Sequence, residues 1–330
     1  MTFARTITST FKSSALLTWK PTGTLQHTIA DCIEKSGKAL HSGELTRVKL
    51  WPESARKGRY FEFHSTCIPA SISFVEESPL CTTLSKDGFR VRTVEHLLSA
   101  LEASGVDNCR IEIQSISGGD NPTVEGRWTS MKHDMPNKFV SKPLELHNGA
   151  ILVHSKVPIF DGSAREWIQA IEQVGLKEAA DQSGSSCEKL APFLNEPVHV
   201  QKNDSFLVAF PSPKLHVTYG IDFPRVPAIG CQWFHSAPLE DSFYSMEIAS
   251  ARTFCLHEEV EKMRNAGLIK GGSKDNAIVC SASEGWLNPP LRFPDEPCRH
   301  KVLDLLGDLS LIARDGNQGL PVVHIVAFKA

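Results

Sequence analysis

Two pairs of residues in this sequence combine side chains that bind a transition metal or act beside one. His300 and Asp304 stand at i and i+4 in a segment with helical periodicity, so both side chains leave the same face of a helix. Glu95 and His96 are adjacent at the start of an earlier helical segment. Together, His96, His300 and Asp304 would supply two imidazoles and a carboxylate and leave one coordination position open, which is typical of catalytic rather than structural zinc. Glu95 would then be a carboxylate beside the reacting water.

Each pair taken alone also has an ordinary structural interpretation. The closing helix has an apolar stripe on its opposite side, made of Val302, Leu305, Leu306 and Leu309. A row such as His300, Asp304 and Asp308 is more often a solvated polar face, because short motifs match by chance. An acidic residue such as Glu95 is favoured in the first turn of any helix by the helix dipole. Residue spacing alone therefore leaves both interpretations open.

The elements that must position these residues are blocks of strands followed by helices. Alternating apolar and polar residues predict strands at 47–51, 61–64, 72–75, 110–114, 206–210, 215–219 and 322–328. Helices are predicted at 93–105, with Thr93 as N-cap and Gly105 at the end, and at 163–175 and 297–314. Because strand blocks and helices do not alternate strictly, the pattern indicates an α+β fold with two similar halves.

Short strings that include these residues occur in a fixed order along the chain. They are Ala-Leu-His-Ser-Gly at 39–43, Leu-Cys-Thr at 80–82, Thr-Val-Glu-His-Leu at 93–97, Phe-Asp-Gly-Ser-Ala at 160–164, Ala-Arg-Thr-Phe at 251–254, Gly-Gly-Ser at 271–273, Leu-Arg-Phe at 291–293, Arg-His-Lys at 299–301 and Gly-Asp at 307–308. In these strings the chain resembles UDP-3-O-acyl-N-acetylglucosamine deacetylase, the zinc enzyme committed to lipid A biosynthesis, in its organellar plant-type form. The resemblance covers most of the chain from Gln26 to Ala330. It implies two similar sheet-plus-two-helix domains that pack with their helices facing and with the zinc site between them.

The resemblance also implies roles for individual residues. Zn²⁺ would be held by His96, His300 and Asp304, and Glu95 would accept the proton of the attacking water. Thr253 and Lys301 would donate hydrogen bonds to the oxyanion. Asp308 would pair with the family's C-terminal catalytic histidine, which is linked to protonation of the leaving amine. The implied reaction removes the N-acetyl group of UDP-3-O-acyl-N-acetylglucosamine and releases acetate.

The resemblance also implies residues that bind the substrate of that reaction, which carries an acyl chain. These are Leu80, Cys81, Phe254, Gly272 and Ser273. The stretch 254–279 resembles the family's insert that forms a hydrophobic passage, with Phe254, Met263, Leu268 and Ile269 as candidates. A Met-containing stripe is more often simply part of a core, so this assignment depends on the resemblance.

Two features depart from the family pattern. The family needs only a short connection where this chain has a proline-containing segment at about 118–156, which we expect to be a poorly ordered excursion. The chain ends at Phe328-Lys329-Ala330, directly before the Gly-His-Ala that carries the family's last catalytic histidine, so domain II is expected to be truncated. An impaired paralogue that binds zinc or acylated nucleotide sugar without efficient turnover is therefore the alternative function. A structural-zinc or pure interaction protein is disfavoured, since only three ligands and an adjacent Glu are present.

Composition limits the other possibilities. The net charge of -3 with interspersed signs predicts no nucleic-acid partner, and no apolar stretch is long enough to span a bilayer. The 9 cysteines are scattered without a Cys-x-x-Cys motif, which favours a reducing compartment. The expected domains are 25–180, including the 118–156 insertion, and 187–330, joined by a polar linker near 179–186.

Residues 1–24 have the composition of a transit peptide. Arg5, Lys12 and Lys20 are the only charged residues before Asp31, and Ser and Thr are frequent. Apolar residues at 3, 7 and 11 predict a basic amphipathic helix that ends near Pro21. A merely disordered N-terminus and chloroplast delivery are the alternatives; the arginine and the early apolar stripe favour the mitochondrial matrix.

Overall fold

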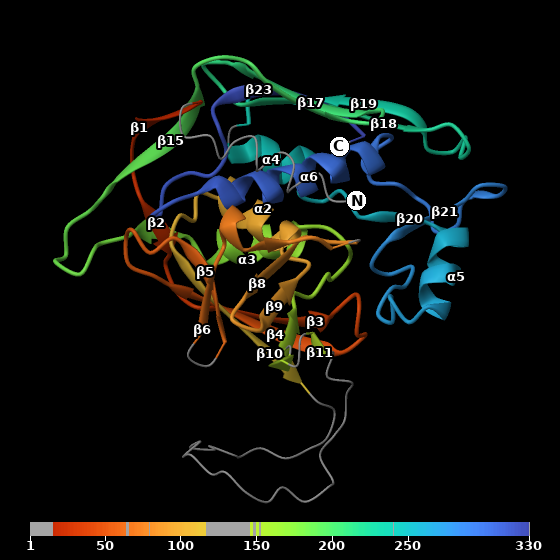
Figure 1. Ribbon diagram of the computed structural model, residues 1–330, viewed down its shortest axis with the longest axis horizontal. Coiled ribbons are helices and arrows are strands. Elements are labelled where there is room, and N and C mark those ends of the chain that lie inside the picture. Colours follow the sequence, from red (N-terminus) through yellow and green to blue (C-terminus); the bar gives the residue numbers. More distant parts are fainter. Residues whose placement is uncertain are drawn as a thin grey trace, which may run out of the picture.

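Two five-stranded sheets enclose a layer of helices (Figure 1). The computed structural model describes residues 16–63, 66–78, 80–116, 146–147, 150–151, 153–239 and 241–329. In spatial order the first sheet contains β3 (Ile33–Lys38), β4 (Leu45–Pro52), β10 (Cys109–Ile116), β5 (Arg59–Phe63) and β6 (Thr66–Pro69). The second contains β16 (Val198–Lys202), β17 (Ser205–Pro211), β23 (Val323–Phe328), β18 (His216–Phe223) and β19 (Gly230–His235).

The two sheets have the same topology. In each, the strand that comes last along the chain lies in the middle, antiparallel to the second strand and parallel to the third. The outer pairs are antiparallel in both sheets. The mixed α+β class predicted from the strand and helix pattern is therefore confirmed.

The helices between the sheets are α2 (Glu95–Ala103), α3 (Arg165–Val174), α4 (Asp241–Glu247) and α6 (Glu296–Leu309). In Figure 1, α4 and α6 lie beneath the second sheet, and α2 and α3 lie above the first. Leu97, Leu98 and Leu101 of α2 are fully buried, as are Val302 and Leu309 of α6. This central helix layer carries the apolar core, and its polar residues lie where α2 and α6 meet.

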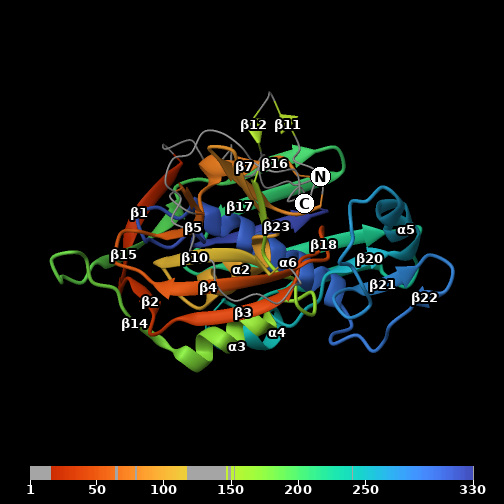
Figure 2. The same ribbon diagram turned by 90° about the horizontal axis from the view of Figure 1, so that it is seen from below.

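Smaller elements surround this frame. A four-stranded sheet contains, in spatial order, β13 (Val153–Lys156), β9 (Phe89–Arg92), β8 (Thr83–Lys86) and β7 (Val75–Glu76). At one side of the molecule, β20 (Phe254–Leu256), β21 (Ile278–Ser281) and β22 (Gly285–Trp286) lie with α5 (His257–Asn265) (Figure 2). Strand pairs are formed by β1 (Leu17–Leu25) with β15 (Glu188–Leu194), β2 (His27–Ile29) with β14 (Leu176–Glu178), and β11 (Leu146–His147) with β12 (Ala150–Ile151). Single 3₁₀ turns occur at Ile72–Phe74 and Ser310–Ile312.

Three local predictions are wrong. Residues 72–74 form a 3₁₀ turn rather than a strand, and only Val75 continues into β7. Thr93 does not cap α2: its φ of 62° is left-handed, its hydroxyl has no hydrogen-bond partner, and Val94 precedes the helix. Residues 17–21 do not end a helix, because they pair with β15 as part of β1.

The other predicted strands and helices are found close to their expected positions. Within the 118–156 segment, β13 pairs with β9 in parallel. The rest of that segment, apart from β11 and β12, lies outside the described residues, as do residues 1–15 with the apolar positions 3, 7 and 11.

Helices α2 and α6 approach each other closely at Gly307. A Cβ atom placed on Gly307 would lie 2.1 Å from the backbone O of Glu95. A second contact between the halves involves the buried ion pair of Arg59 and Glu102 in the first half, whose side chains are 2% and 4% exposed: Arg59 donates to the backbone O of Ser310 at 3.2 Å. Glu102 also accepts the backbone N–H groups of Gly319 and Leu320 at 2.8 Å. The halves are thus joined by buried polar contacts as well as by apolar packing.

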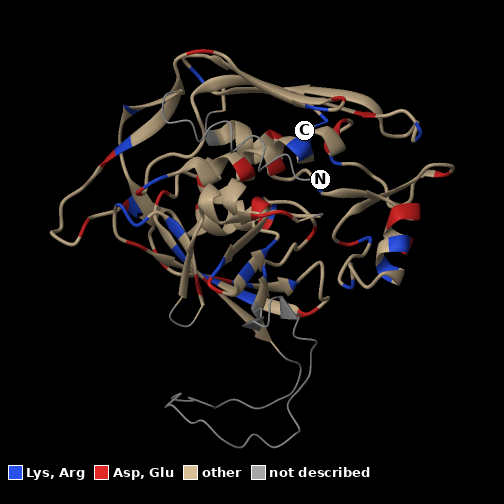
Figure 3. Cartoon of the chain, viewed as in Figure 1, with Lys and Arg blue, Asp and Glu red and all other residues tan. Residues whose placement is uncertain are grey.

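Charged residues of both signs are mixed along the chain (Figure 3). In the described residues, no helix is both long enough and apolar enough to cross a membrane.

Candidate metal centre

The site begins with three side chains that α2 and α6 bring together. His96 lies in the first turn of α2, and His300 and Asp304 lie one turn apart on α6. One potential ligand atom of each lies within 4.8 Å of the others. His96 and His300 are buried, with side chains 6% and 2% exposed. The polar row on α6 is therefore not a solvated face, because α2 covers its first turns.

The spacing of these atoms suits a tetrahedral cation. Asp304 Oδ1 lies 3.5 Å from His96 Nε2 and 3.4 Å from His300 Nε2. Metal–ligand bonds of ~2.0–2.2 Å at tetrahedral angles place neighbouring ligand atoms ~3.4 Å apart. Asp304 Oδ1 is buried and accepts no hydrogen bond. A buried carboxylate oxygen without a donor is costly unless a cation compensates it, so the residues present fit zinc.

The protonation states of His300 and Asp304 favour metal binding as well. Burial is the main cause that lowers the pKa of His300 to about 4, which keeps the imidazole neutral at neutral pH. Its Nδ1–H donates to the backbone O of Ala251 at 3.0 Å, so Nε2 presents its lone pair to the site. Burial would raise the pKa of Asp304, but its electrostatic interactions with the His300 imidazole and the Lys301 ammonium outweigh burial and lower that pKa. Asp304 is therefore anionic, as a carboxylate that binds a cation must be.

Glu95 and Asp308 flank the ligands, and Thr82 holds both. The backbone N–H of Thr82 donates to Glu95 Oε2 at 3.0 Å, and its hydroxyl donates to Asp308 Oδ1 at 2.5 Å. Burial, the largest cause, raises the pKa of Glu95 well above its ordinary value and that of Asp308 to about 7. A carboxyl group with a raised pKa suits proton transfer near neutral pH. Thr82 belongs to the string at 80–82, but no pattern of residues singled it out as part of the site.

Lys301 contacts one of the three side chains of the candidate centre directly, whereas Thr253 is two residues along the chain from Ala251, whose carbonyl binds His300. Lys301 Nζ donates to Asp304 Oδ2 at 3.0 Å, and the carboxylate of Asp304 is the main cause that raises the pKa of Lys301. Thr253 follows Ala251 by two residues, and its backbone N–H donates to Gly162 O at 2.7 Å. Gly162 has a φ of 88°, and a Cβ there would lie 2.3 Å from Asn276 O, so the turn requires glycine. This close packing fixes the backbone of Thr253.

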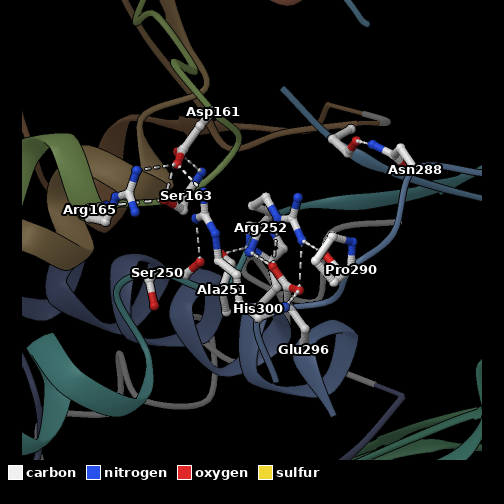
Figure 4. Close-up of polar contacts among 12 residues, drawn as sticks. Asp161, Ser163, Arg165, Ser250, Ala251, Arg252, Asn288, Pro290, Glu296 and His300 are labelled. Atoms are coloured by element: carbon white, nitrogen blue, oxygen red, sulfur yellow. Dashed lines mark hydrogen bonds and ion pairs between the residues drawn. The ribbon is translucent and has the colours of Figure 1, made fainter. Parts of the chain in front are cut away.

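A buried ion-pair network holds the segment that positions His300 (Figure 4). Glu296 is fully buried and accepts from Arg252 Nε at 2.8 Å and from the backbone N–H of Arg252 at 3.0 Å. Arg292 donates to Ser250 O and to Asp161 Oδ2, both at 2.7 Å. Arg252, Arg292 and Asp161 belong to the strings at 251–254, 291–293 and 160–164. These strings therefore fix the Ala251 carbonyl that sets the orientation of His300.

A cavity of about 320 Å³ lies beside this segment. Four of the five predicted substrate-binding residues line it: Leu80, Phe254, Gly272 and Ser273. Thr253, Met263 and Ile269 also line it, whereas Leu268 is 49% exposed and is not part of the lining. The fifth residue, Cys81, is buried instead with its Sγ 3.3 Å from His41 Nε2. The lining is mostly apolar and comes largely from β20, α5 and the loop that follows α5.

Comparisons with known proteins agree with this geometry. The profile of the family described as UDP-3-O-acyl N-acetylglycosamine deacetylase matches residues 26–129 and 142–330. The chain is 55% identical over 322 residues to "Probable UDP-3-O-acyl-N-acetylglucosamine deacetylase 1, mitochondrial" from Arabidopsis thaliana, covering 98% of this chain and 89% of that protein. It is 41% identical over 313 residues to the "UDP-3-O-acyl-N-acetylglucosamine deacetylase" of Trichormus variabilis, covering 92% and 93%. The protein of the same name from Synechocystis is 40% identical over 308 residues, with the same coverage.

Proposed function

Because this chain belongs to the UDP-3-O-acyl N-acetylglycosamine deacetylase family, we propose that the residues at the junction of α2 and α6 carry out the family's reaction. The chain is a zinc-dependent hydrolase that removes the acetyl group from UDP-3-O-acyl-N-acetylglucosamine in lipid A biosynthesis. The observation that carries the assignment of the site is the buried group of His96, His300 and Asp304.

These three residues are the proposed zinc ligands. Bound zinc supplies Lewis acidity, which polarises the amide carbonyl of the substrate and acidifies water. Ala251 keeps His300 in the tautomer that leaves Nε2 free, and Lys301 neutralises the outer oxygen of Asp304. The ligand set is therefore ordered by its own hydrogen bonds.

Glu95 is the proposed general base. Its Oε2 is held by the backbone N–H of Thr82, which leaves Oε1 to accept the proton of the attacking water. The raised pKa of Glu95 makes the protonated form stable enough to exist during turnover.

Thr253 and Lys301 are the proposed donors to the oxyanion that forms when the amide is attacked. Lys301 carries a full positive charge beside Asp304, and Thr253 lies on the cavity wall. Asp308, held by the Thr82 hydroxyl, is the proposed partner of the group that protonates the leaving amine. Breakdown of the tetrahedral intermediate then releases acetate and the free amine.

The apolar cavity is the proposed site of the acyl chain of the substrate. Phe254, Met263 and Ile269 provide apolar surface, and Leu80, Gly272 and Ser273 form further parts of the wall. Cys81 is proposed to support this wall from behind through its contact with His41.

We also infer that the two halves arose by duplication of one sheet-plus-two-helix unit, with zinc bound between the two copies. The support is the shared strand order of the sheets and the origin of the ligands, one from α2 and two from α6. The proposed units are 25–180 and 187–330. Strand β1 crosses this division, since it precedes the first unit and pairs with β15 of the second.

The mitochondrial matrix is the proposed location. The composition of residues 1–24 supports it, and the Arabidopsis relatives are named mitochondrial. A cleavage after residue 24 would remove most of β1. Sequencing the N-terminus of the protein recovered from isolated mitochondria tests the proposed cleavage.

Turnover and zinc content, measured on the same purified samples, test the proposed function. We expect about one zinc per chain at this centre in the wild type and in Glu95→Ala, with turnover lost in the variant. His300→Ala should lose both zinc and turnover. His199→Ala, an exposed position on β16, is the control and should keep both. Undiminished zinc in His300→Ala would refute the ligand assignment, and zinc without turnover in the wild type would support the impaired paralogue.

A further inference from the structure

Three histidines gather on the outer face of the second sheet, away from the candidate metal centre. His324 comes from β23, His216 from β18 and His235 from β19, which are adjacent strands. His216 lies opposite His324 in the parallel register. Val217 and Ile325, the next residues on the two strands, are fully buried toward the helices. Because side chains alternate across a strand, the histidines lie on the face opposite α4 and α6 (Figure 1).

The three rings form a nearly equilateral triangle. Their centroids lie 5.9 Å apart for His216 and His324, 6.0 Å for His235 and His324, and 6.4 Å for His216 and His235. Imidazoles bound to one cation through bonds of ~2.0–2.1 Å have centroids ~5–5.5 Å apart. The two imidazoles of the candidate metal centre, His96 and His300, lie 5.0 Å apart. Shifts of about 1 Å in partly exposed side chains would therefore bring the triangle to coordination distance.

Two of the rings already point at one spot. The hydroxyl of Thr218 lies 2.8 Å from His235 Nδ1 and 3.0 Å from His324 Nε2. A hydroxyl has one proton, so it donates to one imidazole and accepts the N–H of the other. If the ring that donates moves its proton to its other nitrogen and the Thr218 hydroxyl turns away, both lone pairs face a point that a cation can occupy.

The charge state of His324 and the chemistry of imidazole favour a transition cation as ligand. Burial, with the neighbouring His216 and His235, lowers the pKa of His324. Neutral imidazole is the form that binds metal, and three imidazoles suit zinc, copper or nickel rather than magnesium or calcium, which prefer oxygen.

We propose that His216, His235 and His324 form a second metal site, which binds a divalent transition cation of the zinc and copper class. Binding forms three N–metal bonds and breaks the two hydrogen bonds to Thr218. One imidazole changes tautomer, and an imidazole that binds in its neutral form releases no proton. The site lies across the sheet from α6, so it is separate from the proposed catalytic zinc and does not depend on the proposed function.

Calorimetric titration of untagged, zinc-loaded protein with ZnCl₂ at pH 7.5 tests the site. We expect one further equivalent, with affinity reduced at least ~10-fold in His235→Gln and in His324→Gln. Deacetylase activity should be unchanged in both variants. His199→Gln is the matched control, since His199 lies on the same sheet face opposite Val208 and two strands away from β23. It should titrate as the wild type.

A spectroscopic measurement identifies the ligands directly. Replacing the added zinc with one equivalent of Cu²⁺ should give an electron paramagnetic resonance spectrum with splitting from three nitrogens, which His324→Gln reduces to two. The proposal is overturned if no second equivalent binds, if both His→Gln variants titrate as the wild type, or if His199→Gln weakens binding equally.

Discussion

Gly307→Ala should impair catalysis by moving Glu95, although the substitution lies on the neighbouring helix. The new Cβ would lie 2.1 Å from the backbone O of Glu95 and 2.8 Å from its carbonyl carbon. Ordinary contacts between such atoms are ~3.2 Å or longer, so α2 and α6 must separate by about 1 Å. Glu95 and His96 open α2, so both move relative to the ligands on α6.

The expected magnitudes separate this effect from simple destabilisation. Overpacking costs ~1–3 kcal/mol, and the preference of a helix for Ala over Gly offsets ~1 kcal/mol of it. The protein therefore stays folded. A displacement of about 1 Å from the reacting geometry lowers the rate by ~10²-fold. We expect kcat/KM to fall by about that factor while the free energy of unfolding changes by no more than ~2 kcal/mol.

Steady-state deacetylase kinetics, zinc analysis and chemical denaturation on the same preparation provide the assay. Gly184→Ala is the matched control, because Gly184 has a φ of 82° and no atom lies within 4 Å of the position that an alanine Cβ would take. It should lose a similar amount of stability through backbone strain and keep its activity. Wild-type kinetics in Gly307→Ala, or equal losses in both variants, would show that the helix contact does not set the position of Glu95.

Three further predictions concern groups around the centre. Glu296→Gln should lower the free energy of unfolding by ~3 kcal/mol, measured by urea denaturation, because it breaks the buried charge pair with Arg252. Glu247→Gln is the control: Glu247 is half-exposed, so losing its pair with Arg299 should cost at most ~1 kcal/mol. Thr82→Val should lower kcat ~10-fold with zinc content unchanged, since Asp308 loses its hydroxyl donor; an unchanged kcat would remove Thr82 from the machinery. Burial lowers the pKa of His41 from 6.5 to about 4 in the folded protein. The unfolded state therefore binds this proton first as the pH falls below 6.5. The free energy of unfolding should decrease by up to ~3 kcal/mol between pH 6.5 and pH 4. His41→Gln should flatten that part of the stability profile, and an identical profile would contradict the assignment.

Much of the fold could be predicted because each strand or helix carried its own periodic pattern. The alternation at 47–51 and 206–210 and the leucine stripe of α6 each reflect burial on one side of an element. The failures occurred where distant contacts decide the local structure. Residues 17–21 are extended because β15 pairs with them. Thr93 has a left-handed φ at the turn into α2, where its backbone N–H donates to the carbonyl of Thr82 at 3.0 Å.

The shared helix face of His300 and Asp304 was predictable, but the surroundings of the candidate site were not. His300 and Asp304 share a helix face by spacing alone, which any helix would give them. That α2 covers this face follows from tertiary packing and could not be predicted from spacing. Likewise, Glu296 had no local signal, since an acidic residue is common at the start of a helix; only its burial against Arg252 reveals its structural role.

The origin of the ligands on two helices also determines when the protein can acquire its metal. His96 and His300 are about 200 residues apart, and closing a loop of that length in an unfolded chain costs ~5 kcal/mol of chain entropy. The unfolded chain therefore offers no three-ligand site, and binding of a metal by all three residues must follow the docking of α6 onto α2. A polypeptide that crosses a membrane unfolded would arrive without zinc. Metal supply in the compartment where folding finishes would then control how much active protein accumulates.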